Sequence, residues 1–185
     1  KIKNNTFFVT FEKTKNKLTK LNFILNDKLT EKGEFSSMIY ADEILTGEIF
    51  STEFYHDLNE YQILMILASI CYESREKTEI YKLYPSKFIT DLVKDIRNNE
   101  FIKKDRRFRY LGELTGLIHP CYDGKSIFDI MKNTNLNEGD LIRFFRQILD
   151  RLNQIKQATQ DQRLQQMLKS LQDLVYNCLR NIDTV

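Results

Sequence analysis

The sequence is poor in the residues that interrupt regular structure. Its 185 residues include only 6 Gly and 2 Pro. Because these residues are the strongest breakers of helices and strands, long irregular loops are not expected. Hydrophobic residues make up 42% of the chain, which is enough to bury the core of one domain. The scarcity of Gly and Pro therefore favours a helical globular domain.

Cysteine and histidine are too few for the common metal or disulfide frameworks. The three cysteines, Cys71, Cys121 and Cys178, are far apart and odd in number, so we expect free buried thiols in a reducing compartment. The two histidines, His56 and His119, stand at no metal-ligand spacing from a carboxylate or a thiol. We predict no metal site and structural roles for these five side chains.

Long apolar runs and an excess of one charge are also missing. No stretch approaches the ~18 apolar residues of a membrane-spanning helix, and no signal-peptide pattern follows Lys1. We therefore expect an intracellular protein, in the nucleus or the cytoplasm, that contacts no membrane. With 28 Lys+Arg against 26 Asp+Glu, the formal charge is only +2, so any contact with nucleic acid must rest on a local patch. The first residue is Lys rather than Met, which indicates a piece cut from a longer protein.

Apolar residues recur at helical spacing along most of the chain. Helices are expected within 40–50, 58–74, 86–102 and 108–119, the last ended by Pro120, whereas 29–35 is expected to be extended with a turn at Gly33. A short helix after Ser126, a helix of about twenty residues carrying Leu141 and Ile155, and a last helix from Gln162 complete the pattern. The sequence predicts an all-α bundle with a helix-turn-helix-like C-terminal unit and these core residues: Ile63, Leu67, Ile70, Leu92, Phe145, Ile148, Leu152 and Leu171.

The tripeptide Gly124-Lys125-Ser126 resembles the end of a phosphate-binding P-loop. The full motif, G-x-x-x-x-G-K-[ST], needs a second glycine five residues before Gly124, but His119 occupies that position. We interpret the tripeptide as a turn in which Gly124 ends one helix and Ser126 caps the next. No other catalytic motif is present, so we predict that this fragment is not an enzyme and holds no cofactor.

Polar residues follow one face of the expected long helix. Spacings of four, three and four residues place them opposite the apolar face, with Arg146 beside them: Arg143, Gln147, Asp150 and Gln154. Such a face is often only solvated. A helix after a short helix and a turn can also meet nucleic acid, as in helix-turn-helix proteins, so both readings stay open on spacing alone.

Two stretches carry a recognisable pattern. Residues 124–155 read "GKSIFDIMKNTNLNEGDLIRFFRQILDRLNQI", with "EGDLIR" at their centre, and residues 41–73 place acidic residues before a buried segment. Both stretches resemble the DSHCT domain, the C-terminal helical domain of superkiller-like DExH-box RNA helicases, whose signature "EGDLIR" matches without a gap. The resemblance extends from about residue 21 to residue 185. Two positions depart from the family pattern, since Cys121 stands near a usual aromatic and Gln147 replaces a frequent basic residue.

The resemblance implies a function that composition alone does not. It implies a segment 1–32 that ends a preceding winged-helix region, and a helical "ratchet" domain over 33–185 that packs on motor domains of the same polypeptide. It also implies that the long helix lines the path of single-stranded RNA, that ATP and Mg²⁺ belong to the absent motor domains, and that an exoribonuclease complex is a partner of the 3′-to-5′ helicase. The RNA-facing residues would be Arg143, Gln147, Arg146, Asp150 and Gln154. The alternatives are a stand-alone helix-turn-helix binder of DNA and a structural bundle that docks partner proteins.

Overall fold

The computed structural model describes residues 2–73 and 77–180, and most of them are helical. Helix accounts for 70% of the structure and strand for one small hairpin, which confirms the all-α class. The hairpin pairs β1 (Ile24–Leu25) with β2 (Lys28–Leu29) in antiparallel register, Ile24 opposite Leu29. The described residues form these α-helices and 3-10 helices: α1 Ile2–Lys20, α2 Glu31–Ser37, α3 Glu43–Phe50, η1 Glu53–Tyr55, α4 Glu60–Cys71, α5 Lys87–Asn98, η2 Ile102–Lys104, η3 Arg106–Tyr110, α6 Leu111–Tyr122, α7 Ile127–Met131, α8 Glu138–Ala158 and α9 Gln162–Leu179.

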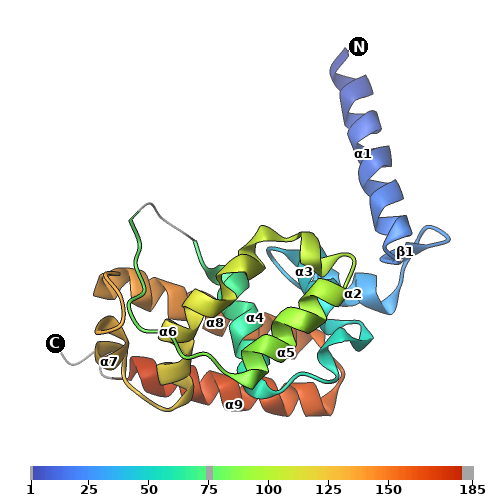
Figure 1. Cartoon of the computed structure of the whole chain (residues 1–185). Coiled ribbons are helices and arrows are strands. Elements are labelled where there is room, and N and C mark those ends of the chain that lie inside the picture. The colour runs from blue at the N-terminus through green and yellow to red at the C-terminus, as the bar shows by residue number, and fades with distance from the viewer. Residues whose placement is uncertain (1, 74–76, 181–185) are drawn as a thin grey trace.

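Helix α4 lies at the centre of the bundle (Figure 1). It begins with a capping box, in which the side chains of Asn59 and Gln62 each accept a hydrogen bond from the other residue's backbone N–H. Every residue from Tyr61 to Cys71 is buried, because α5, α6, α8 and α9 all pack against this helix. All eight predicted core residues are buried, as expected: Ile63, Leu67, Ile70, Leu92, Phe145, Ile148, Leu152 and Leu171.

Helices α7 and α8 form the predicted helix-turn-helix-like unit, and α9 packs along α8. The turn before α7 is a Schellman motif, since the N–H of Gly124 donates to Cys121 O and the N–H of Lys125 donates to Pro120 O. Gly124 has a φ of +75°, which glycine adopts most readily. Ser126 does precede α7, but its hydroxyl donates to the carboxylate of Asp129 rather than accepting a backbone N–H.

Helix α6 continues through Pro120 to Tyr122, so the prediction that Pro120 ends it is wrong. Proline lacks the N–H that would bond to the carbonyl four residues earlier, here Gly116 O. The buried side chain of Asn133 donates its Nδ2–H to that carbonyl over 2.9 Å. Because a side chain from the turn before α8 replaces the missing backbone donor, the helix completes its last turn.

We expect Asn133→Ala to destabilise the domain by about 1–3 kcal/mol, because Gly116 O would then be buried without a donor. Thermal melting of the purified chain measures this effect. Asn153→Ala, which removes an exposed amide from α8, is the matched control and should change stability by no more than about 0.5 kcal/mol. Equal melting of the two variants would contradict this account of Pro120.

The segment 29–35 is not the extended stretch that its sequence suggested. Thr30 accepts a hydrogen bond from the N–H of Gly33 and so caps α2, placing Gly33 inside the first helical turn. A Cβ atom on Gly33 would lie 2.2 Å from the carbonyl oxygen of Phe23. Gly33 is therefore required for close packing of α2 on the hairpin rather than for a turn.

Helix α1 projects away from the bundle, and the hairpin joins it to α2 (Figure 1). Phe23, between α1 and β1, is 2% exposed and packs under the ammonium group of Lys32, which lies 4.4 Å from its ring centroid. Lys32 also forms an ion pair with Glu48 of α3, and both side chains are nearly buried. These contacts fix the hairpin to α2 and α3. The last residues of the predicted domain, 181–185, lie outside the described residues.

Candidate functional site

The N-cap of α8 fixes where the helix begins, and its apolar face fixes which side points outward. The side chain of Asn137 accepts a hydrogen bond from the N–H of Asp140 over 2.8 Å, and two acidic residues lie in the first turn, where the helix dipole favours them. The apolar face has no exposed surface, which forces the opposite face outward: Leu141, Phe145, Ile148, Leu152 and Ile155 are all 0% exposed.

The structure places four of the five predicted site residues at or near the surface of α8. Arg143, Arg146 and Asp150 are exposed, and Gln147 is half-buried. Gln154 is only 6% exposed, so its predicted place on the exposed face is wrong. Its amide accepts a hydrogen bond from the N–H of Tyr40 and donates one to Asp150.

The segment between α2 and α3 covers the side of the C-terminal half of α8 that carries Gln154 and Arg151. Arg151 donates to the carbonyl of Ala41 and lies 3.4 Å from the carboxylate of Asp42. Asp42 also receives an ion pair from Arg107 of η3 at 2.8 Å. These three charges tie α8 to α3 and η3. On the side that carries Gln154 the C-terminal half of α8 is therefore covered, whereas the N-terminal half, with Arg143 and Arg146, stays open to solvent.

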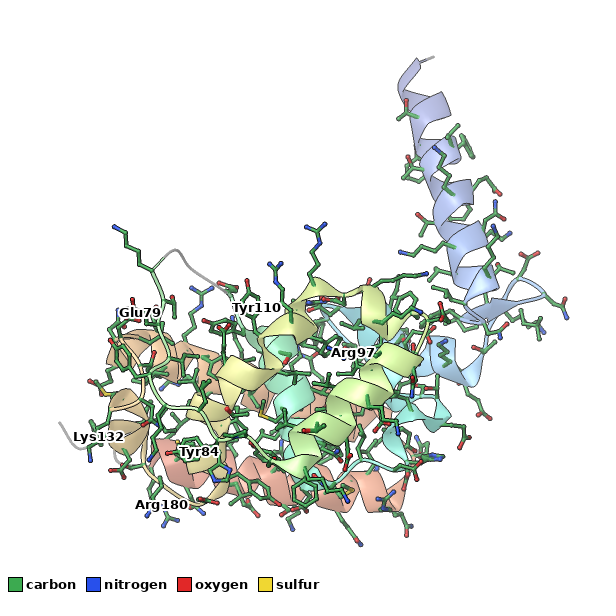
Figure 2. All side chains as sticks on the ribbon, viewed as in Figure 1. Glu79, Tyr84, Arg97, Tyr110, Lys132 and Arg180 are labelled. Carbon is green, nitrogen blue, oxygen red and sulfur yellow. The ribbon has the colours of Figure 1, made fainter. Side chains whose placement is uncertain are left out.

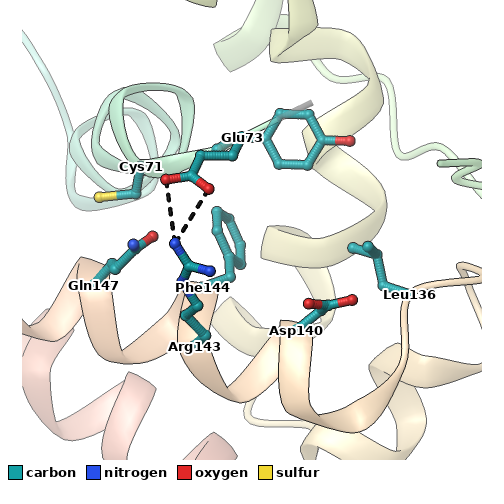
Figure 3. Close-up of a pocket in the computed structure, with 8 residues that line it drawn as sticks. Cys71, Glu73, Leu136, Asp140, Arg143, Phe144 and Gln147 are labelled. Atoms are coloured by element: carbon teal, nitrogen blue, oxygen red, sulfur yellow. Dashed lines mark hydrogen bonds and ion pairs between the residues drawn. The ribbon is translucent and has the colours of Figure 1, made fainter. Parts of the chain in front are cut away.

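A shallow pocket lies where this open half of α8 meets the end of α4 (Figure 3). Arg143 faces Glu73 across it, with Nη2 at 3.3 and 3.5 Å from the two carboxylate oxygens. The remaining lining residues come from α8 and from the segments beside it: Cys71, Tyr72, Leu136, Asp140, Phe144 and Gln147.

The ion pair between Arg143 and Glu73 is weak enough for Arg143 to change its partner. The two side chains are 57% and 64% exposed, and exposed pairs of this kind contribute only about 0–1 kcal/mol. A phosphate can form the same charge-assisted, bidentate hydrogen bonds with a guanidinium as a carboxylate does. Arg143 can therefore exchange Glu73 for a phosphate without leaving α8.

The cysteine of the pocket is not activated as a nucleophile. Burial raises the pKa of the Cys71 thiol to about 11, so the thiolate that a nucleophile requires is scarce at neutral pH. Across residues 2–73 and 77–180, the side chains of His, Cys, Asp and Glu form no cluster that could hold a metal ion.

His119 and the three cysteines, which the sequence analysis considered as possible site residues, occupy structural positions. His119 stacks on Tyr84, with ring centroids 4.4 Å apart, and its Nε2 lies 3.4 Å from Asp123. The three cysteines are buried and free. Within the described part of the chain, no helix combines the length with the apolar content that a membrane crossing requires.

Sequence reasoning missed Glu73 and Tyr72, which complete the pocket from the end of α4. Glu73 is 70 positions before Arg143 in the chain, and no spacing pattern connects two residues so far apart. The signal that α4 carries is its apolar circumference, which predicts burial but not the element that its last turn will meet.

Comparison with known families identifies the domain to which α8 belongs. The model of the DSHCT (NUC185) domain matches residues 26–177, a span that contains α2 to α8 and most of α9. The chain belongs to the DSHCT family. No curated protein matches it. The DSHCT domain is found in DExH-box RNA helicases as a non-catalytic C-terminal domain. Within this DSHCT domain, the signature "EGDLIR" forms the first turns of α8 and delivers Arg143 to the pocket.

Proposed function

We propose that this DSHCT domain lines the path of single-stranded RNA in an ATP-dependent helicase. The observation that carries the proposal is the position of Arg143 on the open half of α8. Its helix is rigid because the opposite face is fully buried, and its guanidinium is held only by an exposed ion pair. Arg146 and Gln147 stand beside it and add a charge and an amide for phosphate, sugar or base.

The proposed domain acts passively. It offers a few donors on a fixed helix and, with a net charge of +2, no global field that would hold RNA tightly, so a strand can slide past it. ATP and Mg²⁺ would be bound by motor domains of the same polypeptide, on which this domain would pack. The parent activity would be 3′-to-5′ unwinding that delivers RNA to an exoribonuclease complex.

The rival proposal is a stand-alone helix-turn-helix domain that binds duplex DNA. A recognition helix needs a free face that can enter the major groove. In α8 the C-terminal half is partly covered, since Gln154 and Arg151 bond to the segment before α3, while Asp150 and Asn153 stay exposed. This arrangement favours a strand that touches the first turns of α8 over a duplex that receives the whole helix.

We expect Arg143→Ala to weaken binding of single-stranded RNA by on the order of 1–2 kcal/mol, because one charge-assisted hydrogen bond is lost. The measurements are unwinding of a 3′-tailed RNA duplex by the complete polypeptide and RNA binding by the 185-residue chain. Thermal stability should stay within about 0.5 kcal/mol of the parent chain, since Arg143 is exposed.

Two matched variants make this experiment decisive. Glu73→Gln removes the competing carboxylate and should strengthen RNA binding, opposite in sign to Arg143→Ala. Lys169→Gln removes a charge from the exposed face of α9 and should change binding little. Normal unwinding by Arg143→Ala, or tighter binding of duplex DNA than of single-stranded RNA, would refute the proposal.

A further inference from the structure

Positive charge is concentrated in the segment 101–110, which connects α5 to α6. Five of its ten residues are basic and one is acidic, although the whole chain carries a formal charge of only +2. The basic residues are Lys103, Lys104, Arg106, Arg107 and Arg109. The average charge of the chain hides this local patch, which we call the η2–η3 ridge.

The backbone of the ridge is held firmly by its own residues. Ile102 and Phe108 are buried in the core. Asn99 accepts hydrogen bonds from the backbone N–H groups of Phe101 and Ile102, at 3.0 and 2.9 Å. The charges of the ridge are therefore presented from a fixed position, so that little ordering is needed when a ligand binds.

Arg107 belongs to the interior of the ridge rather than to its surface. Its guanidinium bonds to Asp105 at 2.7 Å and to Asp42 at 2.8 Å. The hydrogen bond from Arg107 holds the pKa of Asp105 below its ordinary value. Because the negative charge of Asp105 is balanced by Arg107, this one acidic residue does little to offset the outward positive charges of the ridge.

The outward basic residues remain available for a ligand. Lys103, Lys104, Arg106 and Arg109 are all exposed. Lys103 is paired with the carboxylate of Glu100, a surface pair of the kind that contributes little. The side chain of Arg106 makes no hydrogen bond or ion pair with the described residues. The guanidinium of Arg109 lies 5.0 Å from the ring centroid of Tyr110 and donates to its hydroxyl. The ridge thus offers charge beside an aromatic ring.

Aromatic rings connect the ridge to the Arg143 pocket. The rings of Tyr110 and Tyr72 meet edge to face with centroids 5.6 Å apart, and Tyr72 lines the pocket together with Arg143. Figure 2 shows Tyr110 at the upper edge of the bundle, where several nitrogen-tipped side chains project outward. One continuous surface therefore runs from Arg143 over Tyr72 and Tyr110 to Arg109.

We propose that the η2–η3 ridge binds the sugar-phosphate backbone of single-stranded RNA, as a second contact beyond α8. The choice of RNA among single-stranded nucleic acids rests on the proposed function, whereas the rest of the inference rests on the ridge itself. Alternation of arginine with aromatic rings is the chemistry that single-stranded nucleic acids need, because phosphates bind the charges and bases stack on the rings. An acidic protein would use the charges alone and would leave Tyr72 and Tyr110 without a role.

The test measures fluorescence anisotropy of a labelled oligouridine with the 185-residue chain over a range of salt concentrations. We expect the double variant Arg106→Gln/Arg109→Gln to bind roughly tenfold more weakly or worse. The slope of log affinity against log salt should fall by about 1.4, since each phosphate contact on a single strand contributes about 0.7. The double variant Lys87→Gln/Lys169→Gln removes the same charge from exposed sites elsewhere and should retain both affinity and slope.

The outcomes separate this inference from the proposed function. If the ridge variant binds as the charge-matched control does, the inference is overturned, whatever Arg143→Ala does. If the ridge variant loses affinity while Arg143→Ala binds normally, the ridge stands and the role proposed for α8 fails. Displacement of the RNA by polyglutamate of matched charge, or no RNA binding at low salt, would also overturn the inference.

Discussion

Phe145→Ala should lower the free energy of unfolding by about 3–5 kcal/mol, because it opens a cavity in a packed core. Phe145 is 0% exposed and lies on α8, with Phe144 beside it at a ring-centroid distance of 5.2 Å. For a chain of this size the melting temperature should fall by roughly 6–20 °C. Thermal unfolding followed by circular dichroism measures the change.

Two controls separate loss of the core from loss of an aromatic ring or of function. Phe88→Ala removes a ring that is 54% exposed on α5 and should change the melting temperature far less. Arg143→Ala should reduce RNA binding without melting the domain. If Arg143→Ala destabilised the domain as severely as Phe145→Ala, the assignment of one buried and one functional face to α8 would be wrong.

Lys32→Met should also destabilise the domain by about 3–5 kcal/mol, since it leaves the Glu48 carboxylate buried without its partner. The two side chains are only 14% and 12% exposed, and Lys32 also donates to the carbonyl of Leu21 over 2.8 Å. Chemical denaturation of the purified chain gives the change in free energy. The loss should be greatest around the hairpin, where amide exchange should accelerate.

The double variant Lys32→Met/Glu48→Leu tests the cause. Because an apolar pair of similar volume often replaces a buried ion pair without loss, the second substitution should restore much of the stability. Lys15→Met, which breaks the exposed pair with Asp27, should leave melting nearly unchanged. A double variant no more stable than Lys32→Met would show that Lys32 acts through its contacts with Phe23 and Leu21 instead.

Residue spacing was enough to predict the elements whose burial is decided within one helix. The apolar circumference of α4 and the alternating spacing in α8 specify a buried face without reference to the rest of the chain. The same spacing assigned Arg143, Arg146 and Asp150 to the surface, where the structure places them. These predictions depend only on local periodicity, which a sequence displays directly.

The wrong predictions depend on residues that lie far away in the chain. Gln154 has the spacing of an exposed residue, but it is buried and accepts a hydrogen bond from the backbone N–H of Tyr40, 114 positions earlier. Pro120 would end α6 by itself, but Asn133 donates to the carbonyl that Pro120 leaves unpaired, Gly116 O, which lies 17 positions before Asn133. Glu73, 70 positions from Arg143, could not be connected to the pocket for the same reason. Contacts of this kind become visible only when the helices have been assembled.

The burial of α4 has a consequence for the newly made chain. Its partners α5, α6, α8 and α9 all follow it, and α9 ends at Leu179, which is 179 − 71 = 108 residues beyond the end of α4 at Cys71. Synthesis at about 5–20 residues per second leaves roughly 5–20 s between the two events. For that interval the most apolar helix of the domain is uncovered at the ribosome, where transiently exposed hydrophobic surface invites chaperones or aggregation.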